Sequence, residues 1–284
     1  EGSFIGDNNG LALGLIMIVP LLYFLARDEP RRWLRGVLRI TLVMSIAAVP
    51  FTYSRAGFLG LVVVLFMFVG RTRWKWSAMT MAVVASPVVL SLLPQRWFDR
   101  IGTILTYSED GSAISRLTAW GVSWGVALDN PLFGGGFRVL PHPEVWAAYA
   151  PDWMDRIYNA HSIYFEVLAE HGFIGFFLFF GLLGSTVLSM RAVRQQVGQR
   201  PDLLWLVDCS YMVETALLAY LVSGAFYNLA SFDLVYFLVG VAIILKRLAA
   251  DAQVAATGEA PASRASQVAP RLPRAAARWQ PIST

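Results

Sequence analysis

The stretch that decides the fold reads FIGFFLFFGLLGSTVLSM at residues 173–190 and contains no charged side chain. A helix needs about 20 predominantly apolar residues to cross the hydrocarbon core of a bilayer. The whole chain is similarly apolar: 56% of its 284 residues are hydrophobic, 15% are charged, and the mean hydropathy is +0.54. We therefore predict an all-α fold, a polytopic transmembrane helical bundle. This apolar composition excludes a soluble enzyme and a disordered protein. Cys209 is the only cysteine, so a disulfide-stapled secreted domain is excluded as well.

Working outward from residues 173–190, we find further blocks that are long and apolar enough to be spans. The predicted spans cover residues 10–26, 36–53, 57–70, 77–94, 173–190, 206–227 and 233–247. They divide the chain into transmembrane helices at 1–94, a long loop at 95–172, transmembrane helices at 173–248 and a tail at 249–284. The tail is rich in Ala, Pro, Arg and Ser without apolar periodicity, so we expect it to be disordered.

Basic residues follow every second predicted span, and their positions predict the orientation of the chain. The residues are Arg27, Arg31, Arg32, Arg35, Arg71, Arg73, Lys75, Arg191, Arg194, Arg200, Lys246 and Arg247. By the positive-inside rule these ends and the tail are cytoplasmic, and the 95–172 loop faces outward. The net charge of +4 thus fits membrane orientation rather than a nucleic-acid surface. Residue 1 lies outside in this arrangement, and because it is not Met we expect an odd number of spans upstream.

Two arginines stand out in the outward segments. Arg55 lies in the short turn between two apolar blocks, where it is either a snorkelling side chain or a ligand for an anion. Arg116 is expected in the first turn of an amphipathic helix that Ser112 or Ser115 caps and Pro131 ends. Backbone N–H groups of a first turn favour an anion, so Arg116 is either an anion ligand or an exposed arginine without a role.

The sharpest signal lies between Asn159 and Gly172. Asn159 is expected to cap a helix, which places His161 in the first turn and lets Gly172 break or bend the helix before the apolar block. A helix N-terminus disfavours the imidazolium, so His161 is expected to be neutral and able to accept a proton. The alternative is an interfacial histidine that makes one hydrogen bond. Upstream, Gly134-Gly135-Gly136 either permits close approach to a ligand or forms a turn.

Other chemistries find less support in the sequence. There is no DxD motif and no cluster of His and Cys, so we expect no metal site and no cofactor. A glycosidase pair could be drawn from four acids, although their spacing does not favour it: Asp152, Asp155, Glu166 and Glu170. Two histidines, His142 and His171, are expected to be structural. Glu214 is an anomaly, because an acid inside an apolar block is costly and usually functional.

Four short motifs occur one after another along the chain. They are Ser54-Arg55-Ala56-Gly57, Arg116 with Trp120, Asn130-Pro131-Leu132-Phe133-Gly134, and Ala160-His161-Ser162 through Glu170-His171-Gly172. This arrangement resembles the O-antigen ligase family of polytopic membrane glycosyltransferases over residues 1–248. Asp7-Asn8-Asn9 also looks like the ligase-like proteins found beside exosortase systems. Ser162 departs from the pattern, because many members carry Asn there.

The resemblance implies transfer of a glycan from an undecaprenyl-diphosphate carrier to a hydroxyl acceptor, typically the lipid A core. The reaction would occur at the periplasmic face of the bacterial inner membrane, without a metal. His161 matches the essential histidine of the family, Arg55 and Arg116 its two functional arginines, and Glu170 its recurrent acid. Trp120 and the glycines 134–136 are expected to help bind the substrate.

The residues leave the acceptor open. An O-antigen polymerase and a protein O-oligosaccharyltransferase would share the same chemistry and the same motifs. A transporter for a lipid-linked glycan or an ion is a further alternative, but it would predict internal repeats and several charges inside the membrane, and only Glu214 offers such a charge. A scaffold whose histidine is merely interfacial is the last alternative.

Overall fold

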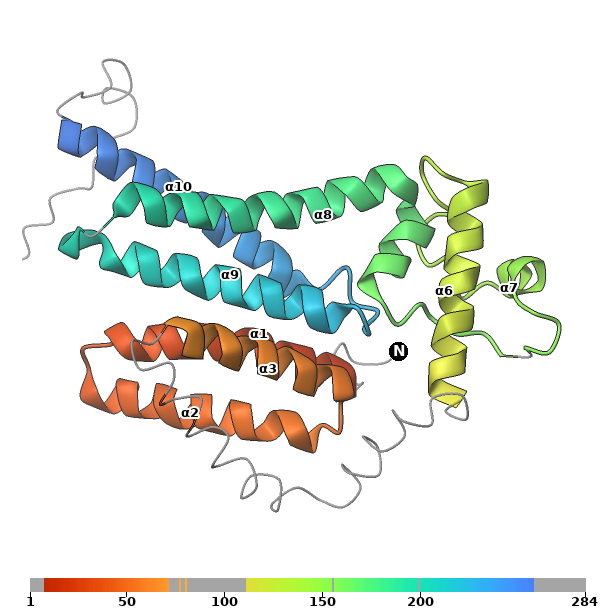
Figure 1. Cartoon of the computed structure of the whole chain (residues 1–284), viewed down its shortest axis with the longest axis horizontal. Coiled ribbons are helices and arrows are strands. Elements are labelled where there is room, and N and C mark those ends of the chain that lie inside the picture. The colour runs from red at the N-terminus through yellow and green to blue at the C-terminus, as the bar shows by residue number, and fades with distance from the viewer. Residues whose placement is uncertain are drawn as a thin grey trace, which may run out of the picture.

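The computed structural model describes residues 8–71, 77, 80, 111–154, 156–198 and 200–257. Every regular element in these ranges is helical, which confirms the all-α prediction (Figure 1). The helices are α1 (Asn8–Asp28), α2 (Arg32–Phe51), α3 (Arg55–Arg71), α6 (Gly111–Asp129), α7 (Pro143–Tyr149), α8 (Ile163–Val197), the 3-10 turn η1 (Pro201–Leu203), α9 (Leu204–Gly224) and α10 (Asp233–Thr257).

Most predicted spans coincide with helices of a bundle. Within the described ranges, the helices long and apolar enough to cross a membrane are α1, α2, α8 and the segment Pro201–Gly224, which contains α9. Helices α3 and α10 occupy the other two predicted spans that the structure describes. The predicted span 77–94 lies outside the described residues except for positions 77 and 80. Helix α10 runs to Thr257, so the first residues of the predicted disordered tail are helical; residues 258–284 lie outside the described part.

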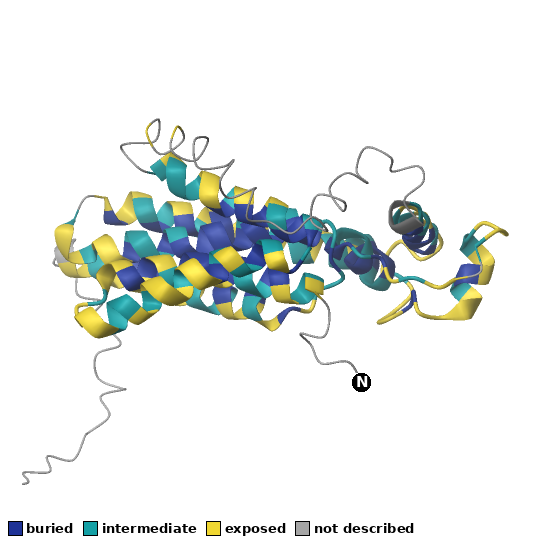
Figure 2. Ribbon diagram, turned by 90° about the horizontal axis from the view of Figure 1, so that it is seen from below, coloured by how far each residue is buried: buried dark blue, intermediate teal, exposed yellow. Residues whose placement is uncertain are grey.

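Helix α9 is the centre of the bundle, because it packs against α1, α3, α8 and α10. Small residues allow the closest approach: a Cβ at Gly57 would lie 2.7 Å from Ala12 of α1, and Gly60 lies against Ser223 of α9. Figure 2 shows buried residues along the middle of the bundle and exposed ones around it. Large apolar side chains such as Phe177 and Leu188 are exposed on the outside, as expected for a surface that faces lipid.

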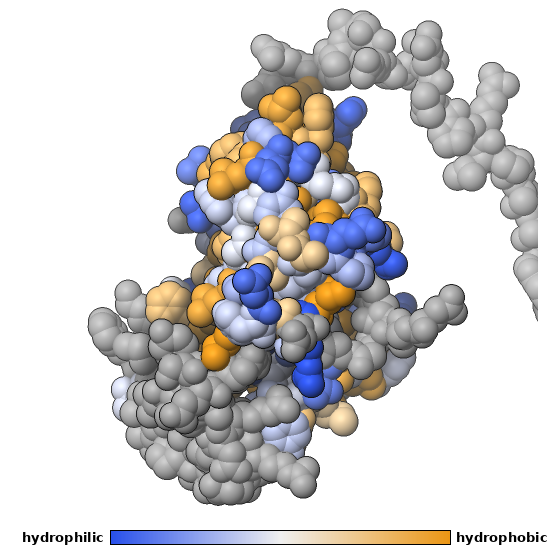
Figure 3. Space-filling view, turned by 90° about the vertical axis from the view of Figure 1, so that its right-hand side faces the viewer, coloured by the Kyte–Doolittle hydropathy of each residue, from blue (hydrophilic) through white to orange (hydrophobic). Residues whose placement is uncertain are grey.

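Helix α8 is broken at Gly172, whose φ of 62° and ψ of −165° are not helical. We call residues 163–171 the short arm and residues 173–197 the long arm. The long arm belongs to the bundle, whereas the short arm lies at its end beside α6 (Figure 1). The short arm, α6, α7 and the segments between them share a separate small core that includes Val122, Leu140 and Trp146. Seen end-on from this side, hydrophilic and hydrophobic side chains are interspersed (Figure 3).

The structure explains the buried acid Glu214 by its partners. The Glu214 carboxylate pairs with Arg194 at 2.6 Å and Arg191 at 2.9 Å, and Arg71 lies 3.9 Å away. The guanidinium groups of Arg71 and Arg194 also lie over the Tyr211 ring, at 3.7 and 4.2 Å from its centroid. The basic ends of α3 and α8 therefore meet, as the predicted common side of the membrane requires.

Candidate functional site

The triple glycine forms a joint with the break in α8. Gly135 N–H donates to the Ala169 carbonyl at 2.8 Å, Gly136 N–H donates to the Glu170 carbonyl at 3.1 Å, and Phe173 N–H donates to the Pro131 carbonyl at 2.8 Å. These bonds satisfy backbone groups that the break would leave unpaired.

Three glycines of this joint, Gly134, Gly135 and Gly172, have no room for side chains. Gly134 has a φ of +68°, and a Cβ there would lie 2.6 Å from Gly172 N. A Cβ at Gly172 would likewise lie 2.7 Å from Gly134 N. The close approach that the glycines permit is thus between two parts of this chain. Their predicted role in substrate binding stays a prediction.

His161 does not lie in the first turn of a helix, and this expectation was wrong. Helix α8 begins at Ile163 with Ser162 as its N-cap residue, so Asn159 caps nothing and His161 precedes the helix. The φ of His161 is 45°, in the left-handed region. Histidine is one of the residues enriched there, and such backbone geometry clusters at functional sites.

Trp120 explains why the helix starts late. Its Nε1–H donates to the Ala160 carbonyl at 2.8 Å, and its ring stacks on Phe165 with 5.0 Å between centroids. These contacts hold the non-helical residues before His161 against α6. Trp120 therefore positions the histidine segment, an effect that a local capping signal cannot reveal.

Arg116 lies one helical turn before Trp120 on the same side of α6. Because α6 begins at Gly111, Arg116 is in the second turn rather than the first, and Ser115 is a buried residue inside the helix instead of its cap. Helix α6 ends at Asp129, just before Pro131, as expected. The guanidinium thus belongs to the helix that holds the histidine segment.

Arg55 is the first residue of α3, and Ser54 caps that helix. The Ser54 Oγ accepts a hydrogen bond from Gly57 N–H at 3.0 Å and lies 2.6 Å from the Tyr227 hydroxyl oxygen. Arg55 thereby places a guanidinium beside the N–H groups of a helix N-terminus, a combination that favours an anion.

The three predicted residues lie at the same end of the bundle, joined through the end of α9. Ile163, two residues after His161, packs against Gly224, where an added Cβ would lie 2.6 Å from Ile163 Cδ1. Gly224 ends α9, and Tyr227 follows with its contact to the cap of Arg55. The Trp120 contact connects the histidine segment to the helix of Arg116.

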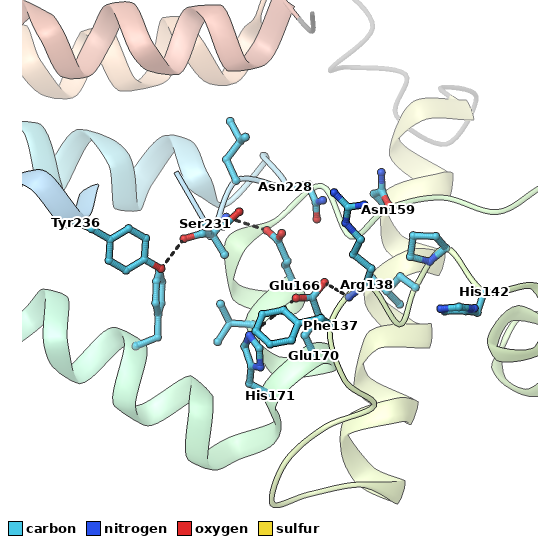
Figure 4. Close-up of a pocket in the computed structure, with 16 residues that line it drawn as sticks. Phe137, Arg138, His142, Asn159, Glu166, Glu170, His171, Asn228, Ser231 and Tyr236 are labelled. Atoms are coloured by element: carbon cyan, nitrogen blue, oxygen red, sulfur yellow. Dashed lines mark hydrogen bonds and ion pairs between the residues drawn. The ribbon is translucent and has the colours of Figure 1, made fainter. Parts of the chain in front are cut away.

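A cavity of about 750 Å³ opens at the end of the bundle where the short arm of α8 lies (Figure 4). It lies between the short arm of α8, the segment 137–142, the loop 228–231 and the start of α10. Its lining is Phe137, Arg138, Leu140, Pro141, His142, Asn159, Glu166, Val167, Glu170, His171, Phe179, Asn228, Leu229, Ala230, Ser231 and Tyr236. Glu170 is the predicted site residue on this wall; Arg55, Arg116, Trp120 and His161 are not among the lining residues.

Two carboxylates of the short arm share the cavity wall. Burial raises the pKa of Glu166 to about 7; an N–H of Ala230, donating to Glu166 Oε2 at 3.0 Å, opposes this rise, and the charge of Glu170 adds to it. Burial also raises the pKa of Glu170. The N–H of Arg138, which donates to Glu170 Oε1 at 2.9 Å, and the nearby His171 both lower this pKa and so oppose the rise. An acid near neutral pKa can hold or release a proton at physiological pH.

Sequence reasoning missed most of this cavity. Glu166 was considered only as one of several acids, although its spacing of four from Glu170 puts both on one helix face. The histidines expected to be structural, His142 and His171, line the cavity. Arg138 and Asn228 carried no local signal, because long-range packing brings them to the wall. Among the described residues, no group of three or more His, Cys, Asp or Glu is arranged to hold a metal ion.

Comparison with known proteins identifies the family. No curated protein matches the chain. A family model described as O-antigen ligase matches residues 40–180, about half of the chain, from α2 to the long arm of α8. This range contains Arg55, Arg116, His161 and Glu170. The match does not distinguish the exosortase-associated subgroup, so membership of that subgroup stays a prediction. The chain belongs to the O-antigen ligase family of glycosyltransferase-type membrane enzymes.

Proposed function

We propose that this chain transfers a glycan from an undecaprenyl-diphosphate carrier to a hydroxyl group of the lipid A core. The reaction would take place at the periplasmic face of the bacterial inner membrane. The observation that best supports this function is a chain of contacts that links the segments carrying Arg55, Arg116 and His161 at one end of the bundle. The contacts run through Tyr227, Gly224, Ile163 and Trp120. The opposite end carries the basic residues that the positive-inside rule assigns to the cytoplasm.

Arg55 and Arg116 hold the diphosphate of the donor in this proposal. When the bond between the sugar C1 and the phosphate oxygen breaks, negative charge accumulates on the departing diphosphate. Guanidinium groups match phosphate oxygens in a bidentate way and stabilise that charge. Arg55 has the further advantage of the helix N-terminus at which it lies.

His161 acts as the general base. Its imidazole takes the proton of the acceptor hydroxyl while the hydroxyl oxygen forms a bond to C1 from the face opposite the diphosphate. The products are the glycosylated acceptor and undecaprenyl diphosphate, and the imidazolium then releases its proton to water. Glu170 supports the site by fixing the segment that begins at Arg138 through the hydrogen bond to its N–H.

Transfer by purified full-length protein tests this function. The assay contains an undecaprenyl-diphosphate-linked glycan and lipid A with its core oligosaccharide, with and without EDTA. We expect transfer in both conditions, and we expect His161→Ala to lower kcat by about 10²–10⁴-fold. Arg55→Ala and Arg116→Ala are expected to raise the KM of the donor more than that of the acceptor. Arg247→Ala is the control, because Arg247 is an exposed residue of α10 at the opposite end of the bundle.

Each alternative has its own outcome in this assay. An unchanged rate for His161→Ala contradicts the base, and loss of activity in EDTA contradicts the metal-free reaction. Elongation of the donor glycan itself would identify a polymerase, and transfer to Ser or Thr of a protein would identify an O-oligosaccharyltransferase. Movement of the lipid-linked glycan across a vesicle without bond formation would favour the transporter.

A further inference from the structure

Arg55 and Arg116, the proposed ligands of the diphosphate, do not line the cavity that contains Glu166 and Glu170, and the chemistry of this cavity suggests a different ligand. We propose that it binds the acceptor through a sugar ring that carries no phosphate group. This inference rests on the proposed function, because it assigns one of the two substrates to a separate place. The cavity volume of about 750 Å³ lies in the range of small-molecule sites, about 300–1,000 Å³.

The carboxylates offer unused acceptor atoms to such a ring. Glu166 uses Oε2 for the Ala230 N–H, and Glu170 uses Oε1 for the Arg138 N–H. Among the described residues, the other oxygen of Glu166 accepts no hydrogen bond, and that of Glu170 has only His171 Nε2 at 3.9 Å. An ionised carboxylate accepts hydrogen bonds, and a protonated carboxyl group accepts and also donates one, so in either state these atoms can pair with sugar hydroxyls.

The charges on the wall argue against a phosphate. Two carboxylates face one guanidinium, that of Arg138, which extends toward Asn159 (Figure 4). A phosphate there would be repelled by Glu170 and by the ionised form of Glu166, in a partly buried place where charges are weakly screened. The donor sugar is bonded directly to its diphosphate and must stay near Arg55 and Arg116. The acceptor is therefore the substrate that the cavity suits.

The cavity also lies where an acceptor must lie relative to the base. Asn159, on its wall, is two residues before His161, so their Cα atoms are at most about 7 Å apart. Asn228, also on the wall, follows Tyr227, whose hydroxyl contacts the cap of Arg55. A sugar held between these amides presents a hydroxyl between His161, the proposed base, and Arg55, a proposed ligand of the diphosphate. Phe137, 83% exposed, offers a ring face for the apolar side of that sugar.

Acceptor kinetics with two matched acceptors test the assignment. The first is lipid A with a core whose terminal sugar is neutral, and the second is the same molecule with a phosphate on that sugar. For the wild-type protein we expect a KM at least tenfold higher for the phosphorylated acceptor. Glu166→Gln keeps the oxygen that accepts from Ala230 but removes the charge. We expect this variant to raise the KM of the neutral acceptor several-fold. The ratio between the KM values of the phosphorylated and the neutral acceptor should therefore become smaller than in the wild type.

Control variants separate this proposal from the proposed function. Glu144→Gln removes an exposed acid of α7 outside the cavity and is expected to change neither KM. If the wild type transfers glycan but uses both acceptors equally, or if Glu166→Gln raises only the KM of the donor, the cavity does not bind the acceptor while the transferase reaction stands. If His161→Ala transfers at the wild-type rate, the proposed base is wrong whatever the acceptor preference.

Discussion

Glu166 illustrates how burial changes the behaviour of a single side chain. It is 9% exposed and keeps one backbone hydrogen bond, from Ala230. The pKa is therefore raised from 4.5 to about 7, because burial disfavours the charged form more than one N–H favours it. The folded protein binds a proton at Glu166 at pH values where the unfolded chain has already released it.

This proton makes the stability of the protein depend on pH. The contribution of Glu166 is fully present below pH 4.5 and is lost as the pH rises through about 7, a difference on the order of 3 kcal/mol. We expect the Tm of the wild type to fall between pH 5 and pH 8, and the Tm of Glu166→Gln to fall clearly less. Thermal unfolding of both proteins at each pH measures this, and parallel curves would contradict the raised pKa.

Sequence motifs predicted some residues of the site and could not predict others. Arg55, Arg116, His161 and Glu170 could be proposed from the sequence because each belongs to a short local motif. Arg138 and Asn228 were not found, because they become neighbours only when segments far apart in the chain pack together. The raised pKa of Glu166 was equally invisible, since it depends on burial rather than on spacing.

At the scale of one element, the break in α8 divides a membrane helix from a helix that carries site residues. The break at Gly172 could be predicted, because glycine before a long apolar block is a local signal. The start of α8 could not, because the Trp120 contact with Ala160 overrides the capping tendency of Asn159. Local sequence signals therefore predict the break of a helix better than its first residue when a tertiary hydrogen bond competes with a capping residue.

Two glycines of α8 provide a matched test of the break. A Cβ at Gly172 would lie 2.7 Å from both Gly134 N and Pro131 O, and its φ of +62° is strained for any other residue, whereas a Cβ at Gly181 meets nothing within 4 Å. We expect Gly172→Ala to lower Tm markedly and to abolish transfer. Gly181→Ala is expected to leave both unchanged or to raise Tm slightly, since Ala is favoured over Gly in a helix by about 1 kcal/mol. Equal effects would contradict the tight joint.

At the scale of the molecule, ion pairs join the helices at the end opposite the site. Arg27 of α1 pairs with Asp208 of α9 at 3.1 Å, and Glu214 of α9 pairs with Arg191 and Arg194 of α8. The sequence showed Glu214 as an anomaly but not its partners, which lie 20 or more positions away in other helices. Hydrophobic blocks thus predict where the long described helices of the bundle lie, and the charges show which of their ends meet.

Removing the Glu214 charge tests how far these pairs hold the bundle together. Glu214→Gln leaves three arginines around a neutral side chain, and loss of one partner of a buried pair costs about 3–5 kcal/mol. We expect a clear fall in Tm and in the yield of folded protein. Asp251→Asn is the control: its pair with Arg247 is more than 60% exposed on both sides, so its loss is expected to cost less than about 1 kcal/mol. A similar Tm for both variants would contradict the structural role of Glu214.

The glycine joint at the break of α8 is made by main-chain atoms alone, and this has a consequence for how such enzymes diversify. Leu132, Phe133 and Phe137 surround the joint, and they are 58%, 73% and 83% exposed. Their side chains take no part in the three hydrogen bonds that fix its shape. The residue at position 137, which lies outside the family motifs, can therefore be exchanged to suit new glycans or new lipids while the scaffold beneath it stays the same.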